Sequence, residues 1–205
     1  MKLAKIISYL LHPVLFSTIS TFLFFIFQPS YLPKPFKYKI LSVIFLSTYV
    51  IPIVFLFILK QRNSIDSFHL KTISERKFPI LFFLTITLLL GIRLLELNAI
   101  DLLAYSFIGV AFALVIVFLL LYSKLKISLH TLAVGGLIGF IITISYHYKM
   151  WLLEFITIGF LLFGVIATAR LKLKAHTVTE VIFGFIIGLI SQLITYYFLP
   201  IILLT

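Results

Sequence analysis

Long apolar runs separated by short polar stretches dominate this sequence of 205 residues. An α-helix needs about 20 apolar residues to cross the hydrocarbon core of a bilayer, and the runs have about that length. The pattern therefore predicts an all-α fold, a polytopic bundle of transmembrane helices with about six or seven spans. The expected spans are residues 6–27, 38–59, 78–97, 101–123, 130–147, 151–169 and 177–199.

The polar connections between these runs contain no internal repeat or low-complexity block, so we expect a single integral-membrane domain over residues 1–205. Around Glu96 and Asp101, one bent helix pair is an alternative to two separate spans. The N-terminal apolar run begins with basic residues but is longer than a signal-peptide core and has no small-x-small cleavage site. These features favour a first helix that is retained.

Composition supports the membrane assignment. Hydrophobic residues make up 62% of the chain and charged residues only 11%, too few polar side chains to cover a soluble domain of this size. The absence of cysteine excludes disulfides, a thiolate nucleophile and a zinc–thiolate site. The formal charge of +11 indicates anionic lipid or phosphate at the membrane surface as the partner, and argues against nucleic acid.

The polar loops are expected on one face of the membrane, because an even number of spans separates the N-terminus from the loops that follow the second, fourth and sixth spans. Twelve of the 17 Lys and Arg residues fall on this face; the other five are Lys34, Lys37, Lys39, Arg93 and Lys149. The positive-inside rule makes the twelve-cation face cytoplasmic, which fits a bacterial cytoplasmic membrane. Three cations of this face, Lys71, Arg76 and Arg170, are also candidate phosphate ligands. Without them, nine cations remain on this face against five on the opposite face.

The stretch ARLKLKAHTVTEVIFG at residues 169–184 carries polar groups at the start of the last span. In a helix beginning here, His176 and Glu180 are one turn apart on the same face. A carboxylate in lipid is costly and marks a functional residue that needs a partner. Glu180 can accept a hydrogen bond from one imidazole nitrogen, which fixes the tautomer and leaves the other nitrogen free as nucleophile or base.

Two further loops on the same face add matching chemistry. The turn at residues 123–130 contains Ser128 and His130, and the loop at residues 60–77 contains Lys71 and Arg76. Two imidazoles beside several cations suit phosphoryl transfer, because the cations neutralise the phosphate oxygens while one histidine attacks phosphorus and the other protonates the leaving oxygen.

These residues resemble the type 2 phosphatidic acid phosphatase superfamily, whose motifs are KxxxxxxRP, PSGH and SRxxxxxHxxxD. Residues 169–180 match the third motif in spacing, residues 127–130 (ISLH) resemble the second, and residues 71–79 resemble the first. The motifs occur in the family's order, and the resemblance covers about residues 71–188.

The chain departs from these motifs at several positions. In the third motif Ala169 replaces Ser and Glu180 replaces Asp, and in the second motif Ile127 and Leu129 replace Pro and Gly. In the first motif the Lys-to-Arg spacing is five instead of seven, and Arg76 is three residues before the proline instead of adjacent to it. Family members commonly have six spans, and many act on the extracytoplasmic face.

The resemblance implies a lipid phosphate or diphosphate phosphatase with a polyprenyl or glycerolipid substrate. His176 would attack phosphorus and form a phosphohistidine, Glu180 would hold its ring, and His130 would protonate the leaving group and later activate water. The phosphate oxygens would be held by Arg170, Arg76, Ser128 and Lys71. No metal and no cofactor is implied, because the guanidinium and ammonium groups supply the positive charge.

Other function classes stay open. The motif departures favour an inactive relative that acts as a membrane scaffold, lipid binder or subunit of a complex. A transporter with an ionisable relay at His130, His176 and Glu180 is a further alternative, although transporters often show two related halves. A metal-dependent hydrolase is least favoured, because neither an H-x-x-x-H pair nor a second carboxylate accompanies these residues.

Overall fold

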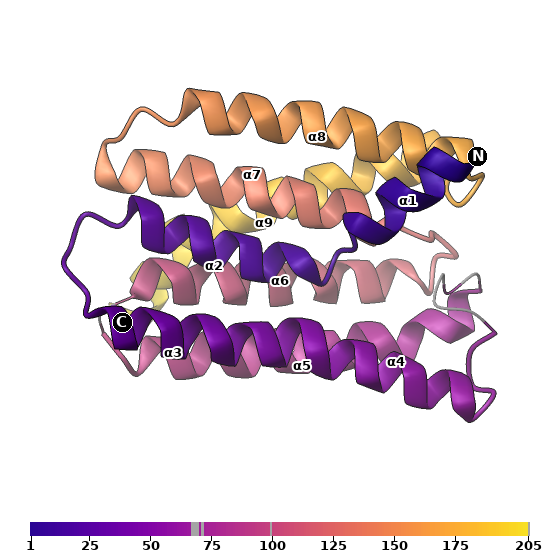
Figure 1. Cartoon of the computed structure of the whole chain (residues 1–205), viewed down its shortest axis with the longest axis horizontal. Helices are drawn as coiled ribbons and strands as arrows, with labels where there is room; N and C mark the ends of the chain where they lie inside the picture. The colour runs from indigo at the N-terminus through magenta and orange to yellow at the C-terminus, as the bar shows by residue number, and fades with distance from the viewer. Residues whose placement is uncertain (67–69, 71, 99, 205) are drawn as a thin grey trace.

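The computed structural model describes residues 1–66, 70, 72–98 and 100–204; helices joined by turns and irregular connections make up this part of the chain, and it contains no β-strand (Figure 1). The all-α prediction is therefore confirmed. The helices in chain order are α1 (Lys2–Leu10), α2 (Leu15–Phe27), α3 (Lys34–Phe45), the π-helical segment η1 (Leu46–Val50), α4 (Ile51–Gln61), α5 (Ile73–Leu95), α6 (Asp101–Leu120), α7 (Leu129–Tyr148), α8 (Leu153–Lys172) and α9 (Val178–Leu204).

Six helices among the described residues are long and apolar enough to cross a membrane. One of them is continuous from Lys34 to Gln61 and comprises α3, η1 and α4. A seventh crossing arises if α1 and α2, which meet at an angle of 55°, count as one bent span. The predicted number of six or seven spans is confirmed, and so is the integral-membrane character of the chain.

Two predicted boundaries are wrong for local reasons. The first span, expected over residues 6–27, breaks between α1 and α2, because Pro13 has no amide hydrogen and disfavours helical geometry at His12. The third span, expected from residue 78, begins at Ile73 because Thr72 and Glu75 form a capping box, each side chain accepting a hydrogen bond from the other residue's amide (3.3 and 3.1 Å). Arg76 therefore lies in the first turn of α5 instead of in a loop.

The helices run between two ends of the bundle. The N-terminus and the connections after α4, α6 and α8 lie at the end drawn on the right of Figure 1, and the C-terminus lies at the other end. The predicted convergence of the polar loops on one face is thus confirmed. Around Glu96 and Asp101, α5 and α6 are separate helices that pack against each other, so the alternative of one bent pair there is not adopted.

Helices α7 and α9 make the closest packing in the bundle, and glycines allow it. A Cβ atom at Gly188 would lie 2.0 Å from the carbonyl oxygen of Leu132, and one at Gly135 would lie 2.1 Å from that of Phe185. Small residues of this kind let membrane helices approach along their backbones. The contact holds the N-terminal ends of α7 and α9 side by side, and these ends carry His130 and Glu180.

Candidate functional site

The N-terminus of α9 is built around a reciprocal cap. The amide of Glu180 donates to the Thr177 hydroxyl (3.3 Å), and the amide of Thr177 donates to Glu180 Oε2 (3.0 Å). This capping box satisfies two of the amides that a helix start leaves without partners. It also fixes the Glu180 carboxylate beside His176, the residue that precedes Thr177.

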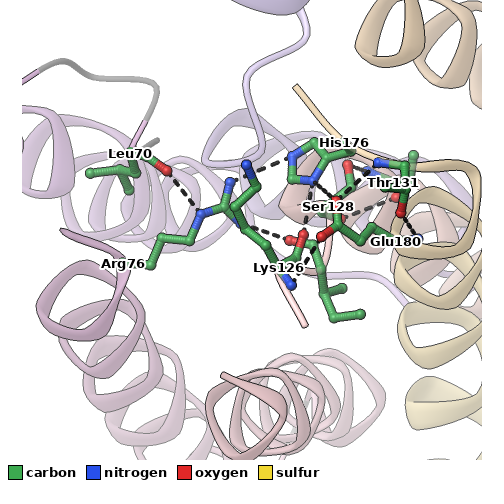
Figure 2. A network of polar contacts seen from close by, with 9 residues as sticks. Leu70, Arg76, Lys126, Ser128, Thr131, His176 and Glu180 are labelled. Carbon is green, nitrogen blue, oxygen red and sulfur yellow. Dashed lines mark hydrogen bonds and ion pairs between the residues drawn. The ribbon is translucent and has the colours of Figure 1, made fainter. Parts of the chain in front are cut away.

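His176 is held in one tautomer. Its Nδ1 lies 2.8 Å from the carbonyl oxygen of Lys126 and 3.1 Å from Glu180 Oε2 (Figure 2). Both partners are acceptors, so Nδ1 carries the hydrogen and Nε2 keeps its lone pair. The predicted contact between His176 and Glu180 is present, but the predicted helix start is wrong: α9 begins at Val178, so His176 precedes the helix and the capping box, not a helical turn, brings the pair together.

The turn between α6 and α7 is tied to the same carboxylate through its main chain. The amide of Lys126 donates to Glu180 Oε1 (3.2 Å), and the amide of Ser128 donates to the carbonyl oxygen of Glu180 (3.2 Å). Sequence reasoning missed this role of Lys126, because main-chain donors and acceptors are common to nearly all residues. Burial and the positive charge of Arg76 lower the pKa of the Lys126 ammonium group, so its side chain also belongs to the electrostatic environment of the site.

Arg76 lies between this turn and the loop before α5. Its Nε donates to the carbonyl oxygen of Leu70 and one terminal nitrogen to that of Ile127 (both 2.9 Å), and the other terminal nitrogen is 3.5 Å from His176 Nε2 (Figure 2). The residue is only 4% exposed. Arg76 therefore faces the nitrogen of His176 that carries the lone pair.

Arg170, at the end of α8, is a second buried guanidinium, 3% exposed. One terminal nitrogen donates to the hydroxyl of Ser8, and its Nε has no hydrogen-bond partner among the described residues. Within the part of the chain that the structure describes, neither Arg170 nor Arg76 forms an ion pair with a carboxylate. A buried charge is costly without a counter-ion, so two such cations make this region strongly attractive to an anion.

These cations act on His176. Burial, followed by the positive charges of Arg76 and Arg170, lowers the pKa of His176 from 6.5 to about 3. The imidazole is therefore neutral at physiological pH, with a lone pair on Nε2 available for attack on an electrophile.

His130 approaches the same place from the first turn of α7. Its Nε2 is 3.1 Å from the carbonyl oxygen of Ser8 and 3.3 Å from the Ser8 hydroxyl. The ring of His12 stands edge-on to it, with 5.7 Å between centroids. Ser8 and His12 were not predicted as site residues; α1 ends at this point because of Pro13, but nothing in the sequence links α1 to helices far along the chain.

A cavity of about 150 Å³ joins these groups to the interior of the bundle. Its polar end is lined by Ser8, His12, Arg76, His130, Arg170 and His176. The rest is lined mainly by apolar side chains of the helices around it, including Phe55 of α4, Phe83 of α5 and Phe107 of α6. The cavity thus has one end lined by charged and polar side chains, and the rest of it is mainly apolar.

The predicted residues thus separate into three groups. His176, His130, Arg76 and Arg170 come together at the cavity, and Glu180 contacts His176. Ser128 is fully buried and is not among the described residues that line the cavity; its hydroxyl accepts from the Thr131 amide (3.5 Å) and caps α7. Lys71 lies outside the described residues.

In the described part of the chain, no cluster of three or more His, Asp or Glu side chains could hold a metal ion. Comparisons of the chain with protein-family models, with curated proteins and with solved structures give no match. The relation to the phosphatase superfamily therefore stays a prediction.

Proposed function

We propose that this protein is a membrane-embedded phosphatase of lipid phosphates or diphosphates, a divergent relative of the type 2 phosphatidic acid phosphatases, working through a phosphohistidine without a metal. One observation carries the proposal. A buried, neutral histidine with its Nδ1 hydrogen held by acceptors directs its Nε2 toward a buried guanidinium, and a second buried guanidinium lines the same cavity. Neither cation is paired with a carboxylate within the described residues.

In the first step, the Nε2 lone pair of His176 attacks phosphorus in line with the leaving oxygen. A P–N bond forms, the bond between phosphorus and that oxygen breaks, and His130, whose protonated form is favoured once the negatively charged phosphate is bound, gives its proton to the leaving group. The imidazole ring becomes positively charged, and Glu180 stabilises this charge through the Nδ1 hydrogen that it already accepts. Arg76 and Arg170 bind the phosphate oxygens and neutralise their charge in a water-poor site.

In the second step, His130 takes a proton from water as the water oxygen attacks phosphorus. The P–N bond breaks, inorganic phosphate leaves and Nε2 regains its lone pair, while His130 is protonated for the next cycle. Lys71 is proposed as a further phosphate ligand on the motif alone. Ser128 has no role in this scheme beyond capping α7.

The substrate class follows from the cavity. Its polar end suits a phosphate group, and its apolar continuation between the helices suits a hydrocarbon chain that enters from the bilayer. A polyprenyl or glycerolipid phosphate combines these two parts.

A second candidate, a lipid-phosphate binder without turnover, is favoured by one feature. Leu129 stands where the superfamily has glycine and contributes its side chain to the lining of the cavity. The cations would still bind phosphate, while the altered lining would prevent in-line attack.

One experiment separates the two candidates. Phosphate release and lipid binding are both measured for the purified protein in detergent with EDTA present. The lipids are undecaprenyl diphosphate, phosphatidylglycerophosphate and phosphatidic acid, and the variants His176→Ala and His147→Ala are measured beside wild type. His147 is the matched control, because it lies at the other end of α7 against Tyr196. Phosphate release that survives EDTA and His147→Ala but is lost in His176→Ala supports the phosphatase. Binding without release supports the binder, and neither binding nor release contradicts both.

A further inference from the structure

Ser8 connects α1 to two groups of the proposed site. It is 5% exposed and lines the polar end of the cavity. Its hydroxyl accepts from Arg170, 162 residues along the chain, and its carbonyl oxygen lies 3.1 Å from His130 Nε2, 122 residues along. A single residue of α1 therefore contacts both the cation at the end of α8 and the histidine at the start of α7.

The carbonyl contact arises from the way α1 ends. The last carbonyls of a helix have no amide partner within the helix, and α1 stops two residues after Ser8. Pro13 prevents the helix from continuing. The carbonyl oxygen of Ser8 is thus available to His130.

This contact fixes the protonation pattern of His130. A carbonyl oxygen only accepts, so Nε2 of His130 carries a hydrogen, and Nδ1 is the nitrogen that can gain or lose a proton during a reaction. Ser8 therefore does for His130 what Lys126 and Glu180 do for His176: it holds one ring nitrogen and leaves the other to act.

The hydroxyl contact orients Arg170 without using up its donors. A guanidinium has five N–H groups, and Ser8 accepts from one of them. The Nε hydrogen of Arg170 is buried and has no partner among the described residues. Ser8 and a phosphate oxygen can therefore bind the same guanidinium together, so Ser8 does not compete with the anion.

We infer that Ser8 is a positioning residue of the phosphate site, and that α1 is an integral part of this site although it lies outside the segment that resembles the phosphatase superfamily. The hydroxyl of Ser8 holds Arg170 in the orientation that receives phosphate, and its carbonyl oxygen holds His130 in the tautomer that the reaction uses. This inference rests on the proposed function, because it takes phosphate as the ligand of the cavity.

The test compares wild-type protein with Ser8→Ala, Ser8→Thr and Ser8→Cys, and with Ser191→Ala as matched control, since Ser191 of α9 is another buried serine but is not among the described residues that line the cavity. The affinities for inorganic phosphate and orthovanadate are measured from ligand-dependent melting temperatures. The KM and kcat for lipid phosphate and their pH profiles are measured beside them. The affinities report on the site even where turnover is slow.

We expect Ser8→Ala to weaken phosphate binding at least about tenfold, which corresponds to about 1.4 kcal/mol. The KM should rise by a similar factor. The kcat and its pH profile should change less than the affinity, because the variant loses the Ser8 hydroxyl, 3.3 Å from His130 Nε2, but retains the nearer backbone carbonyl oxygen at 3.1 Å. Ser8→Thr keeps the hydroxyl and should restore binding, Ser8→Cys should be intermediate because a thiol is a weak acceptor, and Ser191→Ala should match wild type.

Two results would overturn the inference and leave the proposed function standing. In both, wild-type protein binds phosphate; in the first Ser8→Ala binds it as tightly as wild type, and in the second Ser8→Ala binds it more tightly than wild type. The first would make Ser8 a structural contact only, and the second would make it a competitor of the anion. If Ser8→Ala does not fold, the phosphate affinities of Ser8→Thr and Ser8→Cys are compared instead. Weaker binding by Ser8→Cys supports the inference, and equal or tighter binding by Ser8→Cys overturns it. If the wild-type protein neither binds phosphate nor releases it from lipid, the proposed function fails, and the inference fails with it.

Discussion

Replacement of Arg170 by Met tests whether the cavity is an anion site. The guanidinium is 3% exposed, has one hydrogen-bond partner and forms no ion pair with a carboxylate among the described residues. If its purpose is to bind phosphate, its charge destabilises the ligand-free protein. Met keeps the length and apolar stem of the side chain and removes the charge.

The expected effect follows from opposing contributions. Arg170→Met removes the desolvation cost of a buried charge, which is several kcal/mol in real proteins, and an unpaired buried donor that costs about 1–3 kcal/mol. It also removes a charged hydrogen bond to Ser8 that contributes about 1.5–3 kcal/mol. The variant should therefore be more stable than wild type by about 2 kcal/mol, which raises Tm by about 4–8 °C in a chain of this size.

The assay is thermal melting of both proteins in detergent, with and without inorganic phosphate. Wild-type protein should gain about 2.7 kcal/mol when phosphate is at one hundred times its Kd, and the variant should gain far less at the same concentration. Arg93→Met is the control: Arg93 and its partner Glu96 are 75% and 57% exposed, so its stability should change by no more than about 0.5 kcal/mol. A variant that melts below wild type and responds equally to phosphate would show that Arg170 is a structural residue and would refute the reasoning.

Three further predictions concern the orienting pair and the packing behind it. The pKa of His176 is about 3 in the folded protein and 6.5 in the unfolded chain, so between these pH values the unfolded state binds more protons. The free energy of unfolding should therefore fall by up to about 1.4 kcal/mol per pH unit as the pH drops below 6.5. His176→Asn should remove this part of the pH dependence of Tm, and identical curves of Tm against pH for the two proteins would contradict the prediction. Glu180→Gln should lower kcat by about 10²-fold or more, because an amide does not stabilise the imidazolium, and Glu180→Asp should lose less; equal losses in phosphate-release assays would exclude a role for the charge. Gly188→Ala should destabilise the bundle by about 1–3 kcal/mol, because the new Cβ would lie 2.0 Å from the Leu132 carbonyl oxygen, whereas Gly164→Ala in α8, with nothing within 4 Å, should melt at or slightly above wild type.

Hydropathy predicted the helical class, the number of spans and the common face of the polar loops, because in lipid the backbone must satisfy its own hydrogen bonds within each span. It did not predict where helices begin. The start of α5 depends on the capping pair Thr72 and Glu75, and the break after α1 depends on Pro13. These local effects do not alter the mean apolarity of a window, although the T-x-x-E spacing was visible in the sequence.

For the site, spacing in the sequence was sufficient where the partners are close along the chain. His176 and Glu180 are four residues apart, and they meet because the capping box at Thr177 turns the Glu180 carboxylate back toward the residue that precedes the cap. The contact of Ser8 with Arg170 spans 162 residues and depends on how α1 packs against α8, which no pattern in α1 reveals. Ser128 illustrates the converse: its position before a helix predicts an N-cap as well as a phosphate ligand, and its hydroxyl has the capping contact.

Glu180 stands where the motif of the phosphatase superfamily has Asp, and the length of its side chain has a physical explanation in this structure. One oxygen of Glu180 accepts from His176 and Thr177, and the other reaches across to the amide of Lys126 in the turn before α7. An Asp would be one methylene shorter and would lose one of these contacts unless α9 moved toward the turn. Such a movement is opposed by the glycine contacts, where α7 and α9 already touch backbone to backbone. The longer carboxylate therefore fits the spacing that the helix packing imposes, and a Glu at this position contacts His176 without any movement of α9.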